Sequence, residues 1–184
     1  MINYNRLGRS VDFYSVNNYI RIESPWTVTS DISDITRPAN KTNWEITNKN
    51  KVLVASGEQS FLYLYNKGFL PIGRFQTITP CFRDEPFGKF HTKYFIKNEL
   101  IITDNTSESS LYELVETCKV FFEKELQVPI DIIKTDEGFD LNYANYELGS
   151  YGIRTCEFLT WIYGTGCAEP RMSMIEYITK NGIS

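Results

Sequence analysis

Two runs of strand-forming residues, 74–84 and 93–103, constrain the fold of this chain more than any other feature. Only a short segment separates them, so we expect them to pair as a hairpin. Side chains two residues apart on a strand share a face. Arg83 and Glu85 therefore point the same way beside the first run. On the second run the side chains that share a face are Phe95, Lys97 and Glu99.

One face of this hairpin would then carry a fixed cation, two carboxylates and an aromatic ring. An arginine matches phosphate oxygens as a planar fork. A carboxylate accepts hydrogen bonds from an amino group, and a phenylalanine ring can stack on a base. The set can hold a phosphate, an adenine and an amine together. An isolated Arg83–Glu85 pair would by itself indicate only a surface ion pair, because short motifs match often by chance.

The rest of the chain alternates strand-like and helical segments within one domain, residues 1–184. The clearest helix is 109–126, where apolar residues recur at three- and four-residue spacing. The pattern predicts an α+β fold, an antiparallel β-sheet flanked by helices on one side. Further helices are expected at 10–18, 59–67 and 168–180. Further strands are expected at 19–23, 52–55, 130–134, 139–143, 146–153 and 155–163.

Composition limits the class of protein. With 184 residues and 42% apolar content the chain suits one domain with a sizeable core. It has no stretch near the ~20 apolar residues of a membrane span and no apolar leader, so we expect no membrane partner and a cytoplasmic location. A net charge of −4 gives no support to tight nucleic-acid binding by the chain alone. Four scattered cysteines form no metal-binding motif, and we predict no zinc.

Three segments together carry a family resemblance. They are Ile22-Glu23-Ser24-Pro25-Trp26, then Thr79-Pro80-Cys81-Phe82-Arg83-Asp84-Glu85 followed by Phe95-Ile96-Lys97-Asn98-Glu99, and finally Gly164-Thr165-Gly166-Cys167-Ala168-Glu169-Pro170-Arg171. In this order they resemble the three signature motifs of class II aminoacyl-tRNA synthetases, and most closely those of the seryl enzymes. The resemblance covers residues 19 to 175. It implies the catalytic fold of that class, without an appended tRNA-binding domain.

The resemblance implies an ATP site. Arg83 and Arg171 would be the catalytic cations on the phosphates, and Glu85 would accept from the adenine amino group. Phe95 would stack on the adenine ring. The glycine pair, Gly164 and Gly166, would let the backbone approach the nucleotide closely.

ATP brings Mg²⁺, which prefers oxygen ligands. The run Tyr146–Ser150 resembles the seryl-enzyme segment before the third motif, which assigns the metal to Glu147 and Ser150. The alternative for Glu147 is a solvent-facing carboxylate at a strand edge.

The amino-acid substrate needs an anionic partner for its ammonium group. Ser56 and Glu58 resemble the element that supplies it, with Glu99 as a second negative group facing the same pocket. Trp161 and Tyr163 stand where the seryl pattern has smaller polar residues, so a small amino acid is expected. Glu58 could instead be a charge at a helix N-terminus, where the helix dipole favours it.

The leading hypothesis is ATP-dependent amino-acid activation, that is, aminoacyl-adenylate formation. The acceptor would be a tRNA, a carrier protein or a small molecule. The alternative is a non-catalytic paralogue that binds amino acid or nucleotide and regulates a partner. Pro25 ends a strand with large apolar neighbours, Ile20, Ile22 and Trp26, which predicts a symmetric homodimer. In the alternative, these side chains fill the core of the monomer itself.

Overall fold

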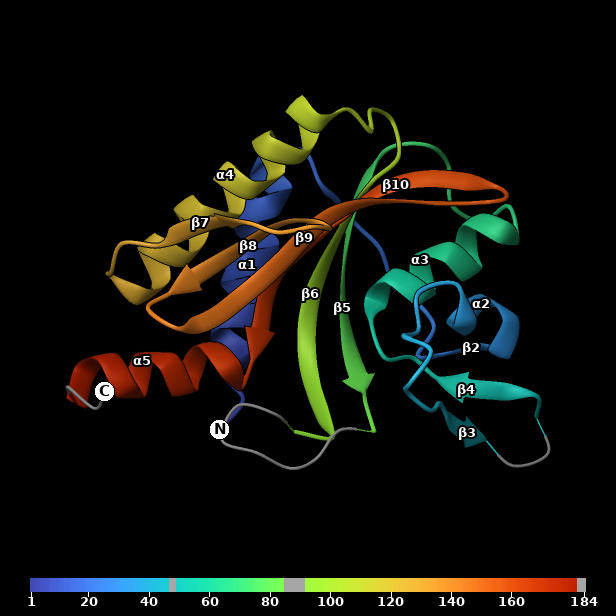
Figure 1. Cartoon of the computed structure of the whole chain (residues 1–184), viewed down its shortest axis with the longest axis horizontal. Helices are drawn as coiled ribbons and strands as arrows, with labels where there is room; N and C mark the ends of the chain where they lie inside the picture. The colour runs from blue at the N-terminus through green and yellow to red at the C-terminus, as the bar shows by residue number, and fades with distance from the viewer. Residues whose placement is uncertain (47–48, 85–91, 182–184) are drawn as a thin grey trace.

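The computed structural model describes residues 1–46, 49–84 and 92–181. Its centre is a seven-stranded sheet in the order β1-β5-β6-β10-β9-β8-β7 (Figure 1). Every pairing in it is antiparallel except that of the edge strand β1 with β5. The strands are β1 (Ile20–Arg21), β5 (Arg74–Phe82), β6 (Tyr94–Ile102), β7 (Asp131–Lys134), β8 (Gly138–Tyr143), β9 (Tyr146–Cys156) and β10 (Leu159–Glu169).

The predicted hairpin is confirmed. β5 and β6 pair without a register shift from Arg74↔Ile102 to Phe82↔Tyr94. Because the pairing is regular, the two-residue alternation expected from the sequence holds on both strands. Glu99 lies opposite Thr77, and its side chain is buried on the same face as Lys97. Glu85 lies outside the described residues.

Helices cover both faces of the sheet, so the expectation that they lie on one side is wrong. The larger core lies under α1 (Tyr4–Val16), α4 (Glu108–Leu126) and α5 (Arg171–Asn181), and it includes Leu100 and Ile102. Ile101, between those two residues, belongs to the second core on the opposite face. The prediction failed because the end of β6, residues 100–102, is apolar on both faces, and a sheet buried on both sides needs cover on both sides.

The second core is closed by smaller elements. They are α3 (Gly57–Asn66), α2 (Ser30–Asp34) and a three-stranded sheet of β2 (Thr27–Thr29), β4 (Lys51–Leu53) and β3 (Trp44–Ile46). Figure 1 shows this group beside β5, on the side away from α1 and α4. The sequence predicted only loop with short elements for residues 27–50, because Asn, Thr and Pro dominate that stretch. No described helix is long and apolar enough to cross a membrane.

Three boundaries differ from the sequence prediction. α1 begins at Tyr4 because the Asn3 side chain accepts a hydrogen bond from the Arg6 backbone N–H at 3.0 Å. The expected strand 155–163 is divided by a turn at residues 157–158 into β9 and β10. β10 then continues through the glycine pair to Glu169, and the closing helix begins at Arg171 rather than at residue 168.

Candidate active site

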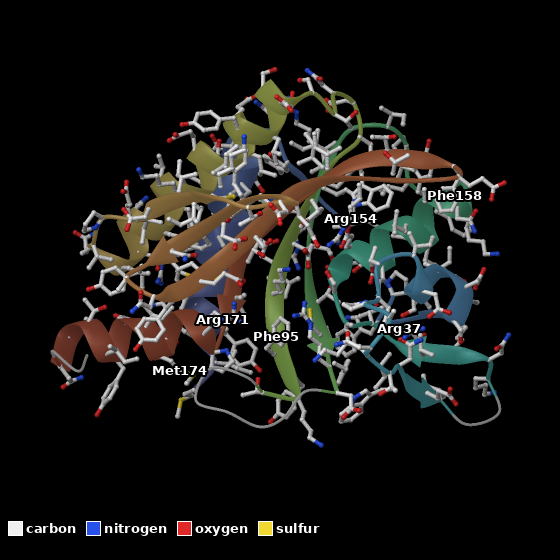
Figure 2. All side chains as sticks on the ribbon, viewed as in Figure 1. Arg37, Phe95, Arg154, Phe158, Arg171 and Met174 are labelled. Carbon is white, nitrogen blue, oxygen red and sulfur yellow. The ribbon has the colours of Figure 1, made fainter. Side chains whose placement is uncertain are left out.

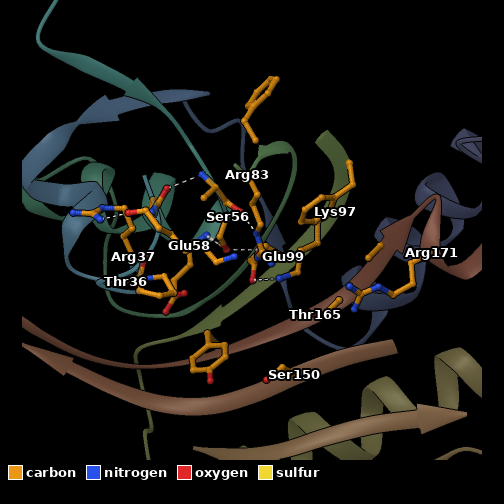
Figure 3. Close-up of a pocket in the computed structure, with 18 of the residues that line it drawn as sticks. Thr36, Arg37, Ser56, Glu58, Arg83, Lys97, Glu99, Ser150, Thr165 and Arg171 are labelled. Atoms are coloured by element: carbon orange, nitrogen blue, oxygen red, sulfur yellow. Dashed lines mark hydrogen bonds and ion pairs between the residues drawn. The ribbon is translucent and has the colours of Figure 1, made fainter. Parts of the chain in front are cut away.

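A cavity of about 390 Å³ lies on the α3 side of the central strands. Its floor is formed by β6, β9 and β10, and its walls by the start of α3, the end of β5 and residues 36–43. Figure 3 shows Arg171 at one end and Arg37 at the other. The cavity brings together most of the predicted site residues, namely Ser56, Glu58, Arg83, Phe95, Glu99, Glu147, Ser150, Tyr163 and Arg171.

Arg83 enters the cavity just beyond the end of β5. Its Nε donates to the Ala55 carbonyl oxygen at 3.1 Å, and its guanidinium carbon lies 5.0 Å from the centre of the Phe95 ring. These two contacts fix the direction of the guanidinium. No described carboxylate forms an ion pair with it, so its terminal nitrogens still have hydrogen bonds to donate within the part of the chain that the structure describes.

Glu99 lies on the floor near the middle of the cavity and is 1% exposed. Its Oε1 accepts from Lys97 Nζ at 2.8 Å, and its Oε2 accepts from Ser56 Oγ at 2.8 Å. Ser56 also caps α3, because its Oγ accepts from the Glu58 backbone N–H at 3.3 Å. The buried carboxylate is thus satisfied on both oxygens, and each oxygen has capacity for a further donor such as an ammonium group.

Glu58 is held from two sides in the first turn of α3. Trp161 Nε1 donates to its Oε1 at 2.7 Å, and Arg154 Nη1 donates to its Oε2 at 2.7 Å. Burial raises the pKa of the Glu58 carboxyl, and the nearby Arg154 charge offsets only part of that rise. The structure therefore gives Glu58 a tertiary role beyond that of a charge at a helix N-terminus.

Arg171 lies at the other end of the cavity, at the start of α5. Its Nη1 donates to Glu147 Oε1 at 2.9 Å, and the Glu147 side chain, although 48% exposed as the solvent-facing alternative expects, is thereby held at the cavity. The first turn of α5 is anchored through buried Glu169. That carboxylate accepts from Arg6 Nη1 at 2.5 Å and from the Ser173 backbone N–H at 3.3 Å. Through Arg6, helix α1 thereby helps to hold the start of α5 in place, and with it Arg171.

Glu147 and Ser150 present a carboxylate and a hydroxyl to the cavity. These residues fit a magnesium ion that arrives with ATP, because Mg²⁺ commonly takes one or two carboxylates and completes its shell with phosphates and water. Among the residues that the structure describes, no group of three or more His, Cys, Asp or Glu side chains is placed to hold a metal ion.

Three predicted site residues do not line the cavity. Trp161 is fully buried behind Glu58, which removes the ground on which it was expected to limit substrate size. Gly164 faces the other core, where an added Cβ would lie 2.7 Å from the Tyr151 ring. At Gly166 the same atom would lie 2.7 Å from the Tyr14 ring. Both glycines therefore have a packing reason to lack a side chain.

Arg154 is the main cavity residue that the sequence analysis missed. Its guanidinium carbon lies 4.1 Å from the centre of the Tyr163 ring, and Nη2 contacts Glu137 Oε2 at 3.3 Å. A signal existed, because Arg154 is four residues from Ser150 on β9 and so shares its face. The match to known motifs ends at Ser150, so no motif singles out Arg154.

The strand register fixes the order of these groups along the cavity. Lys97 pairs with Ala168, Glu99 with Thr165, and Arg154 with Trp161. Successive rows on one face are about 7 Å apart. The cavity therefore runs from Arg171, past Lys97 and Glu99, to Tyr163 and Arg154. Figure 2 agrees, with Arg171 and Phe95 toward one end of the strands and Arg154 toward the other.

Comparison with family models and with curated proteins finds no match. Solved structures do match. Pyrrolysyl-tRNA synthetase from Desulfitobacterium hafniense aligns with 95% of this chain and 69% of its own, at TM-score 0.74 and 15% identity. Serine-tRNA ligase from Naegleria fowleri, in complex with AMP, aligns with 91% of this chain at TM-score 0.71 and 17% identity. Seryl-tRNA synthetase from Pyrococcus horikoshii, complexed with ATP, aligns with 96% at TM-score 0.72 and 13% identity.

The chain spans about half the length of the two seryl enzymes. At these identities the likeness concerns the fold, and it covers nearly the whole chain. The fold implied by the three sequence segments is thus confirmed by structures whose sequences differ greatly from this one. The chain has the fold of the catalytic domain of class II aminoacyl-tRNA synthetases.

Proposed function

We propose that the chain activates an amino acid with ATP and forms an aminoacyl adenylate. The observation that carries this proposal is Arg83, a guanidinium fixed by Ala55 and Phe95 whose terminal nitrogens have no described carboxylate partner. Such a cation suits a reaction between two anions, a carboxylate and a phosphate. The fold supports the same conclusion, because two of the matching structures hold AMP or ATP.

In the proposed reaction a carboxylate oxygen of the amino acid attacks the α-phosphorus of ATP. The new bond is a mixed anhydride, and the bond from the α-phosphorus to the bridging oxygen breaks. Pyrophosphate leaves with that oxygen. Arg83 donates to the α-phosphate and to the attacking carboxylate, and so aligns them and stabilises the charge that develops. Glu99 and Ser56 hold the ammonium group at the middle of the cavity.

The remaining groups would bind the nucleotide. Phe95 would stack on the adenine, Glu85 would accept from its amino group, and Arg171 would bind the terminal phosphates. Glu147 and Ser150 would hold the magnesium ion that comes with ATP, and that ion would neutralise phosphate charge. The ion pair between Glu147 and Arg171 keeps both charges in place in the free protein.

The acceptor of the activated amino acid is a tRNA, a carrier protein or a small molecule in this proposal. The net charge of −4 offers little attraction to a polyanion, so a tRNA would need a helper or a local basic surface. The reaction uses ATP and a free amino acid, which suits a cytoplasmic protein. We also propose a symmetric homodimer through the β1 edge, where Ile20 and Trp26 expose about 60% of their surface.

The test is ATP–pyrophosphate exchange, screened over the amino acids. We expect exchange with at least one of them, and we expect Arg83→Ala to lower its rate about 10²–10³-fold, the usual effect of removing one transition-state donor. Arg83→Lys keeps the charge but loses the planar fork, so it should recover only part of the rate.

The matched control is Arg74→Ala, at the opposite end of the same strand. Arg74 pairs with Asp104 and Glu113 and does not line the cavity, so exchange should be unchanged. Exchange that survives Arg83→Ala at the wild-type rate would contradict the proposal. ATP binding by calorimetry without exchange for any amino acid would instead support the non-catalytic alternative.

A further inference from the structure

Along the direction of the strands, the end of the cavity away from Arg171 holds a guanidinium that adenylate formation does not need. Arg154 is stacked on Tyr163 and bonded to Glu58 and Glu137, so its direction is fixed on three sides. Its side chain is still 32% exposed and lines the cavity. An arginine has five N–H donors, and the two contacts to carboxylates leave others to face a ligand.

Arg154 lies where the side chain of the amino acid would end. If Glu99 holds the ammonium group, the next row along β10 on the same face is Tyr163, about 7 Å away. The Arg154 guanidinium lies against the Tyr163 ring and therefore in this row. A substrate side chain pointing away from the ATP end would meet Arg154 rather than an apolar wall.

Beside the donors of Arg154 stands an acceptor. Glu137 lies in the turn between β7 and β8, with 74% of its side chain exposed, and its Oε2 is 3.3 Å from Arg154 Nη2. A carboxamide carries an acceptor oxygen and two donor hydrogens on one planar group. Arg154 can donate to that oxygen while Glu137 accepts from its nitrogen. Because Glu137 is exposed, it can turn toward a ligand without disturbing the core.

We propose that Arg154 and Glu137 are specificity-determining residues that select an amino acid with an amide side chain. The inference rests on the proposed function, because it takes Glu99 as the ammonium site. A side-chain carboxylate fits worse, since the carboxylates of Glu58 and Glu137 already lie against Arg154 at this end of the cavity. An apolar side chain fits worse as well, because it would bury the Arg154 donors without partners. Glutamine, which reaches one methylene further than asparagine, fits the row spacing better.

The test measures direct binding and exchange side by side. Calorimetry with glutamine, asparagine, glutamate and methionine, with and without ATP, reports binding that does not depend on catalysis. We expect glutamine to bind best and to exceed methionine by about 10²-fold, the order of the penalty for leaving a buried polar group without a partner. Arg154→Met should remove this preference for glutamine, while the thermal melting of the variant reports whether its fold is retained.

Glu137→Ala keeps the test open should Arg154→Met fail to fold, because Glu137 is exposed. It should lower glutamine affinity about tenfold and leave methionine affinity unchanged. Arg74→Met, away from the cavity, should alter neither. Glutamine and asparagine that fail to bind would overturn the inference whatever the exchange assay shows. If the protein then still catalyses exchange with other amino acids, the proposed function stands and only the amide preference is overturned. If glutamine or asparagine binds but no exchange occurs, only the proposed function is overturned.

Discussion

At the scale of single residues, Glu58 has the most unusual environment in the cavity. Burial raises the pKa of its carboxyl above the ordinary value of 4.5. A raised folded-state pKa means that the folded protein holds this proton more tightly than the unfolded chain does. The stability that protonation of Glu58 contributes is full below about pH 4.5 and is lost as the pH rises through the folded-state pKa.

Glu58→Gln should remove this part of the pH dependence. We expect the unfolding free energy of the wild type to fall, relative to that of the variant, as the pH rises above about 4.5. The difference should be on the order of 1 kcal/mol for each pKa unit of displacement. Urea unfolding of both proteins between pH 4.5 and 7 measures it. Two parallel curves would show that Glu58 titrates normally in the folded state.

The four cysteines differ in the reactivity that their surroundings allow. Burial raises the pKa of Cys81 and of Cys118 to about 12, and it raises the pKa of Cys167 as well. Cys156, at the end of β9, is only half-buried. The thiolate is the reactive form. A disulfide reagent at pH 8 should therefore label one thiol quickly in the native protein and four in denaturant. Rapid labelling of two or more in the native state would contradict these placements.

Prediction of single residues from the sequence succeeded where the two-residue alternation of a strand alone decides which face a side chain occupies. Phe95 and Glu99 were placed on one face, and the structure has both lining the cavity. Trp161 was expected to line the cavity too, and it does not. Its neighbour Tyr163 does, because a side chain reaches the cavity only where α3 leaves room beside β10. That depends on the packing of Glu58 against Trp161, which joins residues 103 positions apart.

At the scale of elements, the glycines of α1 and β10 offer a matched comparison. Gly8 lies in α1 with no atom within 4 Å of an added Cβ, whereas at Gly164 that atom would meet Tyr151 and Leu114 below 3 Å. Gly8→Ala should stabilise the protein by about 1 kcal/mol through helix propensity. Gly164→Ala should destabilise it by about 1–3 kcal/mol through overpacking. Thermal and urea unfolding give both values.

The essential result of that comparison is that the two substitutions change the unfolding free energy in opposite directions. Equal effects at the two positions would mean that α4 does not pack on β10 as closely as described. Sequence alone could not separate these glycines. Gly164 was expected to make room for a nucleotide, and the structure shows an aromatic ring from β9 against it instead. A motif reports that a side chain is missing and leaves open which neighbour needs the space.

At the scale of the whole molecule, the proposed dimer is the main prediction. Ile20 and Trp26 lie at the β1 edge and are largely exposed, so they do not fill the core of the monomer, whereas Ile22 packs against the second core as the alternative expects. We expect a dimer at micromolar concentration, and we expect Trp26→Asp to dissociate it because a charge would enter an apolar contact. Sedimentation velocity measures the outcome.

Phe69→Asp is the control for that experiment. Phe69 is 75% exposed and lies in the connection from α3 to β5, outside residues 20–26 of the proposed interface, so the variant should sediment as the wild type does. A wild-type protein that sediments as a monomer and shows full exchange activity would contradict the dimer.

The α+β class of the fold could be predicted from the sequence, but the order of the strands and the cover on both faces of the sheet could not. The hairpin of β5 and β6 follows from local sequence, since its strands are close together in the chain. The position of β10 between β6 and β9 does not, because its pairing with β6 spans some sixty residues. Burial on both faces of β6 was also hidden, since a continuous apolar run such as residues 100–102 has no period to indicate two cores.

The central place of β10 has a consequence for how this protein is made. Among the described residues it is the last strand in sequence, yet it joins the β5–β6 hairpin to the β7–β9 meander. Until residues 159–169 leave the ribosome, β6 and β9 each present an unpaired edge with apolar residues beside it. A nascent chain with open edges is prone to associate with others. A chain whose synthesis stops before residue 159 would thus contain the β5–β6 hairpin and the β7–β9 meander without the strand that joins them.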